Sequence, residues 1–163
     1  MNSQISSAAL LMVLSATAAL AQVNNFQIKG AFDGRDVDVV QGGTLLGNNS
    51  CAGTASYIGR FTFTAKATVD LATGLSSGGG IQLVTANGDT IYGSFVGRGV
   101  PPSDTPNLGH IIELVTITGG TGRFRGATGA FTMDRLIDLT TLPVYASTSG
   151  TLKGTISVSG SAK

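Results

Sequence analysis

A glycine-rich segment between residues 117 and 131 constrains the fold more than any other part of the chain, because it interrupts two runs of strand-like sequence. Its five glycines are Gly119, Gly120, Gly122, Gly126 and Gly129. Glycine tolerates positive φ angles and close backbone approach, so this spacing predicts a shaped loop with several constrained positions. The loop surrounds one large apolar side chain, Phe124. We expect Phe124 to plug one end of the fold.

The clearest periodicity lies in residues 55–69, where apolar and polar residues alternate. A period of two predicts one long strand in a sheet with a wet outer face. Burial favours Phe61 and Phe63 on the inner face, and a shift of one residue would place Arg60 and Thr62 there instead. A strand of this length usually bends, and Gly59 is the expected place for a bulge or corner.

Shorter alternating runs bring the expected number of strands to about eight. They lie in residues 26–28, 81–83, 91–96, 111–117, 131–137 and 152–158. Turn signals separate the runs: Asp33-Gly34, Gly42-Gly43, Ala72-Thr73-Gly74, Asn87-Gly88-Asp89 and a proline-rich stretch over residues 99–109. No segment after residue 22 has a convincing helical stripe, so the pattern predicts an all-β, antiparallel barrel or sandwich.

A family resemblance arises in the glycine-rich segment, which reads Ile-Thr-Gly-Gly-Thr-Gly-Arg-Phe-Arg-Gly-Ala-Thr-Gly over residues 117–129. It resembles the signature of allene oxide cyclases, which plant dirigent proteins and many secreted bacterial proteins share in looser form. Residues 58–62 and 86–90 extend the resemblance in the same order. The resemblance implies a single eight-stranded antiparallel β-barrel and trimer formation. It carries no catalytic residue over to this chain, because the other strands have no matching motif.

The first 21 residues are typical of a cleavable export signal. An apolar run over residues 8–20 ends in Ala19-Leu20-Ala21, a small-x-small cleavage site, although no Lys or Arg precedes the run. The run is shorter than the roughly 18 to 20 apolar residues that span a bilayer. We therefore expect cleavage, a β-barrel domain over residues 22–163, no stable membrane anchor, and a secreted or periplasmic location.

Charge and composition exclude several classes of function. The ten basic and nine acidic residues form no run of like charge, so no nucleic-acid footprint is visible. The single histidine, His110, cannot form a multi-histidine metal site, and we expect no cofactor. The single cysteine, Cys51, is expected to be a buried thiol. Residues 74–78 match the Gly-x-Ser-x-Gly elbow of serine hydrolases, but a turn precedes them and a strand follows, which argues against that chemistry.

Two groups of carboxylates remain ambiguous. A strand beginning at Asp36 would place Asp36 and Asp38 on one face, and we favour a solvated face for them over a weak calcium site. If that face instead turns inward, the two carboxylates would perturb each other's pKa and become acid or base candidates. Glu113 lies in an otherwise apolar strand, so either Arg135 meets it across the sheet or it lines a ligand cavity.

The interior of an eight-stranded barrel is just wide enough for one small ligand, and we expect a small, largely apolar molecule there. The candidate ligand-binding residues are Glu113, Arg123, Arg125, Tyr57 and Tyr92. The arginines could hold a carboxylate or enolate, and the tyrosines offer hydroxyls. The alternatives are an isomerase or cyclase of the allene oxide cyclase type, in which a carboxylate or tyrosine moves a proton, and a structural protein with a fully packed barrel.

Overall fold

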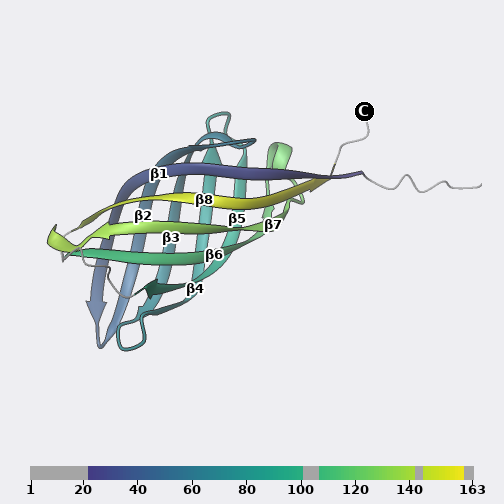
Figure 1. The fold of residues 1–163 in the computed structure, drawn as a ribbon. Helices are drawn as coiled ribbons and strands as arrows, with labels where there is room; N and C mark the ends of the chain where they lie inside the picture. Colours follow the sequence, from purple (N-terminus) through teal and green to yellow (C-terminus); the bar gives the residue numbers. More distant parts are fainter. Residues whose placement is uncertain (1–21, 101–106, 142–144, 160–163) are drawn as a thin grey trace, which may run out of the picture.

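The computed structural model describes residues 22–100, 107–141 and 145–159, which form one closed barrel of eight antiparallel strands. Each strand pairs with its neighbours in chain order, and the first and last strands pair to close the barrel (Figure 1). The strands are β1 (Val23–Gln41), β2 (Thr44–Ala55), β3 (Gly59–Asp70), β4 (Leu75–Thr85), β5 (Thr90–Val100), β6 (Leu108–Gly120), β7 (Thr128–Asp138) and β8 (Ala146–Ser159). The expected all-β barrel is therefore confirmed.

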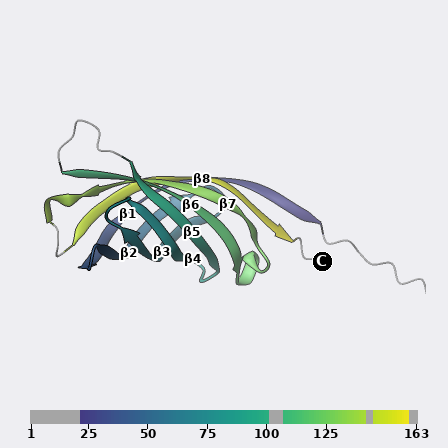
Figure 2. The same ribbon diagram turned by 90° about the horizontal axis from the view of Figure 1, so that it is seen from below.

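The expected export signal in residues 1–21 lies outside the described residues. Within the described part of the chain, no helix is long and apolar enough to cross a membrane. The only helical elements described there are two short 3-10 turns, η1 (Gly122–Phe124) and η2 (Leu139–Thr141). These two turns lie at opposite ends of the barrel (Figures 1 and 2), so we call the ends the η1 end and the η2 end.

Strand β1 continues through the predicted turn at Asp33-Gly34, so that prediction is wrong. It pairs with β8 on one side and with β2 on the other, and both ladders run past Gly34. A Cβ atom on Gly34 would lie 2.7 Å from Sγ of Cys51 and would also collide with the Ser50 carbonyl oxygen. Gly34 therefore allows β1 and β2 to approach closely, because a residue with a Cβ atom would not fit against β2.

The predicted long strand over residues 55–69 is two strands, so that prediction is also wrong. β2 ends at Ala55, β3 begins at Gly59, and a tight turn joins them, with positive φ angles of 64° at Tyr57 and 82° at Gly59. The expected corner at Gly59 is thus confirmed. Phe61 and Phe63 face the interior as predicted, whereas the turn carries Ile58 inward, against the alternation.

Apolar side chains fill most of the barrel interior. The largest of them come from every strand except β2 and include Ile28, Phe32, Phe61, Phe63, Ile81, Leu83, Ile91, Phe95, Val115, Ile117, Phe131, Met133, Leu152 and Ile156. Phe32 and Phe63 meet edge to face, with ring centroids 5.1 Å apart. This packing leaves little room in the middle of the barrel, so any small-molecule site has to lie towards an end.

The glycine-rich loop closes the η1 end as the sequence predicts. Phe124 is fully buried and meets the Tyr57 ring edge to face, with ring centroids 6.2 Å apart. Gly122 and Gly126 have φ angles of 55° and 70°, and a Cβ on Gly122 would collide with the Asp89 carboxylate. The expectations of constrained glycines and of a Phe124 plug are both confirmed.

Candidate functional site

A cavity of about 130 Å3 lies inside the barrel at the η2 end, where the apolar core stops. We call it the Asp36 cavity. Strands β1, β2, β3, β6 and β7 and the turn η2 supply its lining: Asp36, Asp38, Leu45, Gly47, Asn49, Ala67, Val69, Gly109, Ile111, Arg135, Ile137 and Leu139. Exposure increases along β7 and η2 from buried Arg135 and Ile137 to Leu139, which is 40% exposed. The cavity therefore has a buried charged floor and an apolar rim.

Arg135 on β7 forms the floor and is held by two carboxylates. Its Nε donates to Oε2 of Glu113 at 3.0 Å and its Nη2 donates to Oε1 of the same residue at 3.1 Å. Its Nη1 donates to Oδ2 of Asp36 at 2.6 Å and, more weakly, to Oγ1 of Thr148 at 3.4 Å. The expected contact between Glu113 and Arg135 is confirmed, and the two-pronged geometry is that of a strong charge-assisted pair.

Asp36 and Asp38 face the interior, so the preferred interpretation of a solvated face is wrong. Asp36 is only 1% exposed, and Asp38 is half-buried in the cavity wall. Asp33 lies on the opposite, exposed face of β1. Because β1 runs without interruption, residues 28, 32, 36 and 38 all point inward. Arg135 offsets the cost of burying the Asp36 carboxylate, which would be high for an unpaired charge.

The cavity perturbs the acidities of its own groups. Burial raises the pKa of Asp36 above its usual value, although the charge of Arg135 opposes this. Burial and the neighbouring Asp36 charge raise the pKa of Asp38 to about 6. Burial would lower the pKa of Arg135, but Glu113 and Asp36 outweigh it and raise that pKa above the ordinary value. The alternative in which two inward carboxylates have perturbed pKa values is therefore the one that the structure supports.

Cys51 is buried next to this cluster, as the sequence predicts. Burial and the nearby charge of Asp36 raise the pKa of its thiol to about 12. A thiol in this environment stays protonated and is a poor nucleophile. Cys51 therefore belongs to the core and contributes no reactive group to the site.

The five predicted ligand-binding residues do not form one site, although the Arg123 guanidinium lies over the Tyr57 ring, 5.8 Å from its centroid. Glu113 lies behind Arg135 at the η2 end, whereas Arg123 and Tyr57 belong to the η1 end. There Nη2 of Arg123 donates to the Ile58 carbonyl oxygen at 2.6 Å. The Tyr57 ring stacks on the Phe26 ring, with centroids 3.8 Å apart. The other two, Arg125 and Tyr92, are exposed.

The sequence offers an inward face for Asp36 and Asp38 only as the less favoured alternative, and it gives no sign of the apolar lining from Leu45, Val69 and Leu139. Even-numbered positions from Ile28 onward share one face of β1, and that alternation would have placed Asp36 and Asp38 inward. The dipeptide Asp33-Gly34 hides this signal, because its composition favours a turn and a turn would break the register between Phe32 and Asp36.

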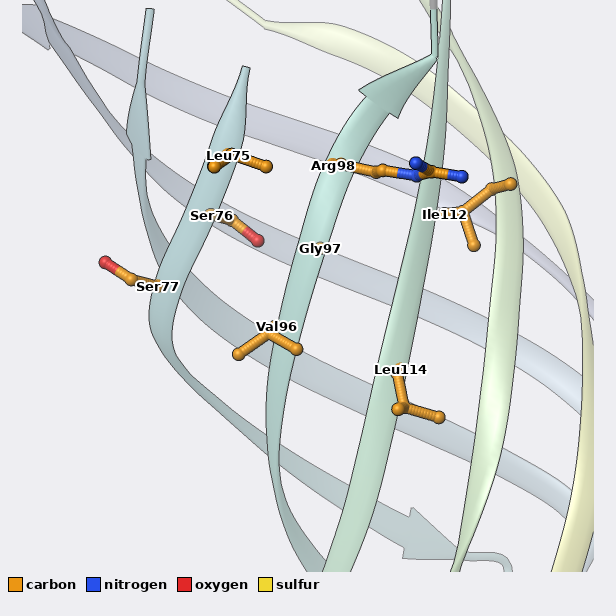
Figure 3. A pocket seen from close by; sticks show the side chains of 8 residues that line it. All are labelled: Leu75, Ser76, Ser77, Val96, Gly97, Arg98, Ile112 and Leu114. Atoms are coloured by element: carbon orange, nitrogen blue, oxygen red, sulfur yellow. The ribbon is translucent and has the colours of Figure 1, made fainter. Parts of the chain in front are cut away.

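A second hollow, of about 480 Å3, lies on the outer surface across β4, β5 and β6. Figure 3 shows Leu75, Val96 and Leu114 on these three neighbouring strands. The same figure shows Ser76 and Ser77 at the start of β4, and no helix follows them, as expected from the argument against a hydrolase elbow. The hollow has exposed apolar walls and one buried hydroxyl without a hydrogen-bond partner, that of Ser76, whereas the Asp36 cavity has three charged groups in its lining, so the hollow offers less chemistry.

Within the described residues, no group of three His, Cys, Asp or Glu side chains is arranged to hold a metal ion. No family model matches the chain, and no curated protein matches its sequence.

Proposed function

We propose that this protein is an exported barrel that holds a small, largely apolar molecule in the Asp36 cavity and does not transform it. The observation that carries the proposal is a partly open hollow with apolar walls inside the barrel at the η2 end. Leu45, Val69 and Ile111 supply much of the apolar wall, and Asp36, Asp38 and Arg135 supply the polar floor. Apolar walls with a few convergent polar groups are typical of small-molecule sites.

The volume of the cavity limits the size of its occupant. A protein cavity of about 150 Å3 lined by apolar side chains binds benzene. The Asp36 cavity, at about 130 Å3, is similar in size. It is well below the roughly 300 to 1,000 Å3 of pockets for drug-sized ligands. We infer a ligand, or the buried end of a longer one, of roughly six to ten non-hydrogen atoms.

Such a ligand binds with limited affinity. The best small ligands gain about 1.5 kcal/mol per non-hydrogen atom, and most gain far less. A dissociation constant from about 1 μM to 1 mM is therefore expected. Binding has to be measured by a method that detects weak complexes, such as chemical-shift titration by NMR.

The test uses toluene as the probe and a variant that fills the cavity. Ala67→Leu adds three carbon atoms to the cavity wall on β3, whereas Ala52→Leu adds the same atoms to the exposed face of the adjacent strand β2. We expect toluene to shift the signals of Ile111, Ile137 and Leu139 in the parent protein and in Ala52→Leu, but not in Ala67→Leu. Equal binding of toluene by Ala67→Leu and the parent protein would contradict the proposed function.

A second candidate function is an isomerase or cyclase that moves a proton on the same ligand. It is favoured by Asp38, whose pKa is raised to about 6, because a carboxyl that titrates near neutral pH can both accept and donate a proton. The resemblance of the glycine-rich loop to allene oxide cyclases fits either function. An enzyme of this kind would lose turnover in Asp38→Asn while still binding toluene, which separates catalysis from binding.

A further inference from the structure

The charges around the Asp36 cavity are unbalanced. Three carboxylates, from Asp36, Asp38 and Glu113, lie at this end of the barrel with one guanidinium, from Arg135, which pairs with Asp36 and Glu113. Among the described residues that line the cavity, Arg135 is the sole cation. Its Nε and Nη2 donate to Glu113, and its Nη1 donates to Asp36. Arg135 therefore neutralises part of the cluster and leaves a negative cavity.

A specific acceptor remains unsatisfied at the floor. Oδ1 of Asp36 is buried and has no hydrogen-bond partner among the described residues, while Oδ2 accepts from Arg135. The Asp36 side chain is 2% exposed, so solvent contributes little to satisfying it. A buried carboxylate oxygen without a donor is costly, and native structures normally provide a partner. A donor from a ligand would supply the missing contact.

Asp38 places a second carboxylate above the first on the same wall. Residues two apart on a strand face the same side about 7 Å from each other. Opposite Asp38 on β2 stands Gly47, and a Cβ atom there would lie 3.2 Å from Oδ1 of Asp38. The glycine leaves space for the Asp38 carboxylate over the β2 backbone. The two carboxylates thus share one wall, below the apolar rim.

We propose that the ligand of the Asp36 cavity is a small primary amine, whose ammonium group lies between Asp36 and Asp38 and whose hydrocarbon part lies against the apolar rim. This inference rests on the proposed function and names its ligand class. An ammonium group carries three donors and a positive charge, which suits the unsatisfied Oδ1 of Asp36 and the neighbouring Asp38 carboxylate. The negative charge of the cavity would repel a ligand carboxylate.

Calcium fits the cavity less well than an ammonium group. Calcium takes six to eight oxygen ligands, and the lining offers side-chain oxygens only from Asp36, Asp38 and Asn49. The remaining wall is apolar and supports a hydrocarbon chain or ring. A neutral alcohol would satisfy one acceptor but would leave the excess negative charge in place.

The experiment compares three probes that share one ring and differ in the attached group: benzylamine, toluene and benzoate. Binding is measured by NMR titration at about pH 7.5, where benzylamine is an ammonium ion and the Asp38 carboxyl is mostly ionised. We expect benzylamine to bind about tenfold or more tightly than toluene or benzoate. Asp38→Asn should lower the ratio of the toluene and benzylamine dissociation constants about tenfold. Asp38→Glu, which keeps the charge, should retain most of the preference for benzylamine.

A matched control is Asp33→Asn, which removes the same charge from the exposed face of β1 and should leave all three affinities unchanged. The inference alone is overturned if toluene or benzoate binds as tightly as benzylamine while Ala67→Leu still weakens binding. It is also overturned if Asp38→Asn keeps the full preference for benzylamine. If none of the three probes binds at millimolar concentration, the proposed function falls together with the inference.

Discussion

Replacing Arg135 by methionine removes the one guanidinium at the floor of the cavity and leaves two buried carboxylates without their partner. In the parent protein Arg135 makes three close charged hydrogen bonds, two to Glu113 and one to Asp36. Hydrogen bonds to charged groups each contribute about 1.5 to 3 kcal/mol, and breaking a buried ion pair from one side costs about 3 to 5 kcal/mol. We therefore expect Arg135→Met to lower the free energy of unfolding by about 3 to 5 kcal/mol at about pH 8.

The loss should depend on pH with a definite sign. The charge of Arg135 lowers the pKa of Asp36, so its removal raises a pKa that burial already holds above the usual value. A carboxyl with a raised pKa in the folded state favours folding when it is protonated. The destabilisation should therefore be smallest near pH 4 and grow as the pH rises.

Urea unfolding followed by far-ultraviolet circular dichroism at about pH 4.5 and pH 8 measures both effects. Arg98→Met, at the outer hollow, is the control and should cost less than about 1 kcal/mol. If Arg135→Met does not fold at pH 8, Arg135→Lys, which keeps the charge but loses the fork geometry, should show a smaller loss with the same trend. A loss that is independent of pH, or below about 1 kcal/mol at pH 8, would refute the reasoning.

Three further predictions concern single side chains. Because burial raises the pKa of Asp38 to about 6, ionisation of this group costs stability as the pH rises from about 4 through 6. Asp38→Asn should therefore raise the free energy of unfolding by about 1 kcal/mol at pH 8, after allowance for partial solvent exposure, and should leave it unchanged near pH 3.5. Asp33→Asn, the control, should leave the free energy of unfolding unchanged at both pH values. The Cys51 thiol, whose pKa is about 12, should not react with a thiol reagent at pH 8 until urea unfolds the protein, and reaction of the native protein at the rate of a free thiol would contradict its burial. Phe124→Ala should lower the free energy of unfolding by about 3 to 5 kcal/mol in urea, while Tyr92→Ala, which trims an exposed ring, should cost far less; equal losses would contradict the plug.

The inner faces of several strands could be predicted because alternation is a local property. Phe61 and Phe63 repeat with a period of two, and so do Phe131 and Met133, so the buried face can be identified without knowing which strands pair. The same logic placed Glu113 among inward residues of β6 and proposed Arg135 as its partner. The Phe124 loop was predictable for a similar reason, since its glycines and its one aromatic residue are close in sequence.

Features that depend on pairing between distant segments could not be predicted. Gly34 lies next to Asp33, a dipeptide that favours turns, and only its contact with Cys51 on β2 explains why the strand continues. The burial of Asp36 depends on Arg135, which lies 99 residues away in the chain. The Asp36 cavity likewise exists only once five strands have closed around it.

NMR titration of the parent protein with benzylamine tests the central claim most directly. The account predicts saturable binding, with a dissociation constant of about 1 mM or below, and shifted signals for residues that line the Asp36 cavity. The binding should be lost in Ala67→Leu and kept in Ala52→Leu. A parent protein that binds neither benzylamine nor toluene would contradict the account.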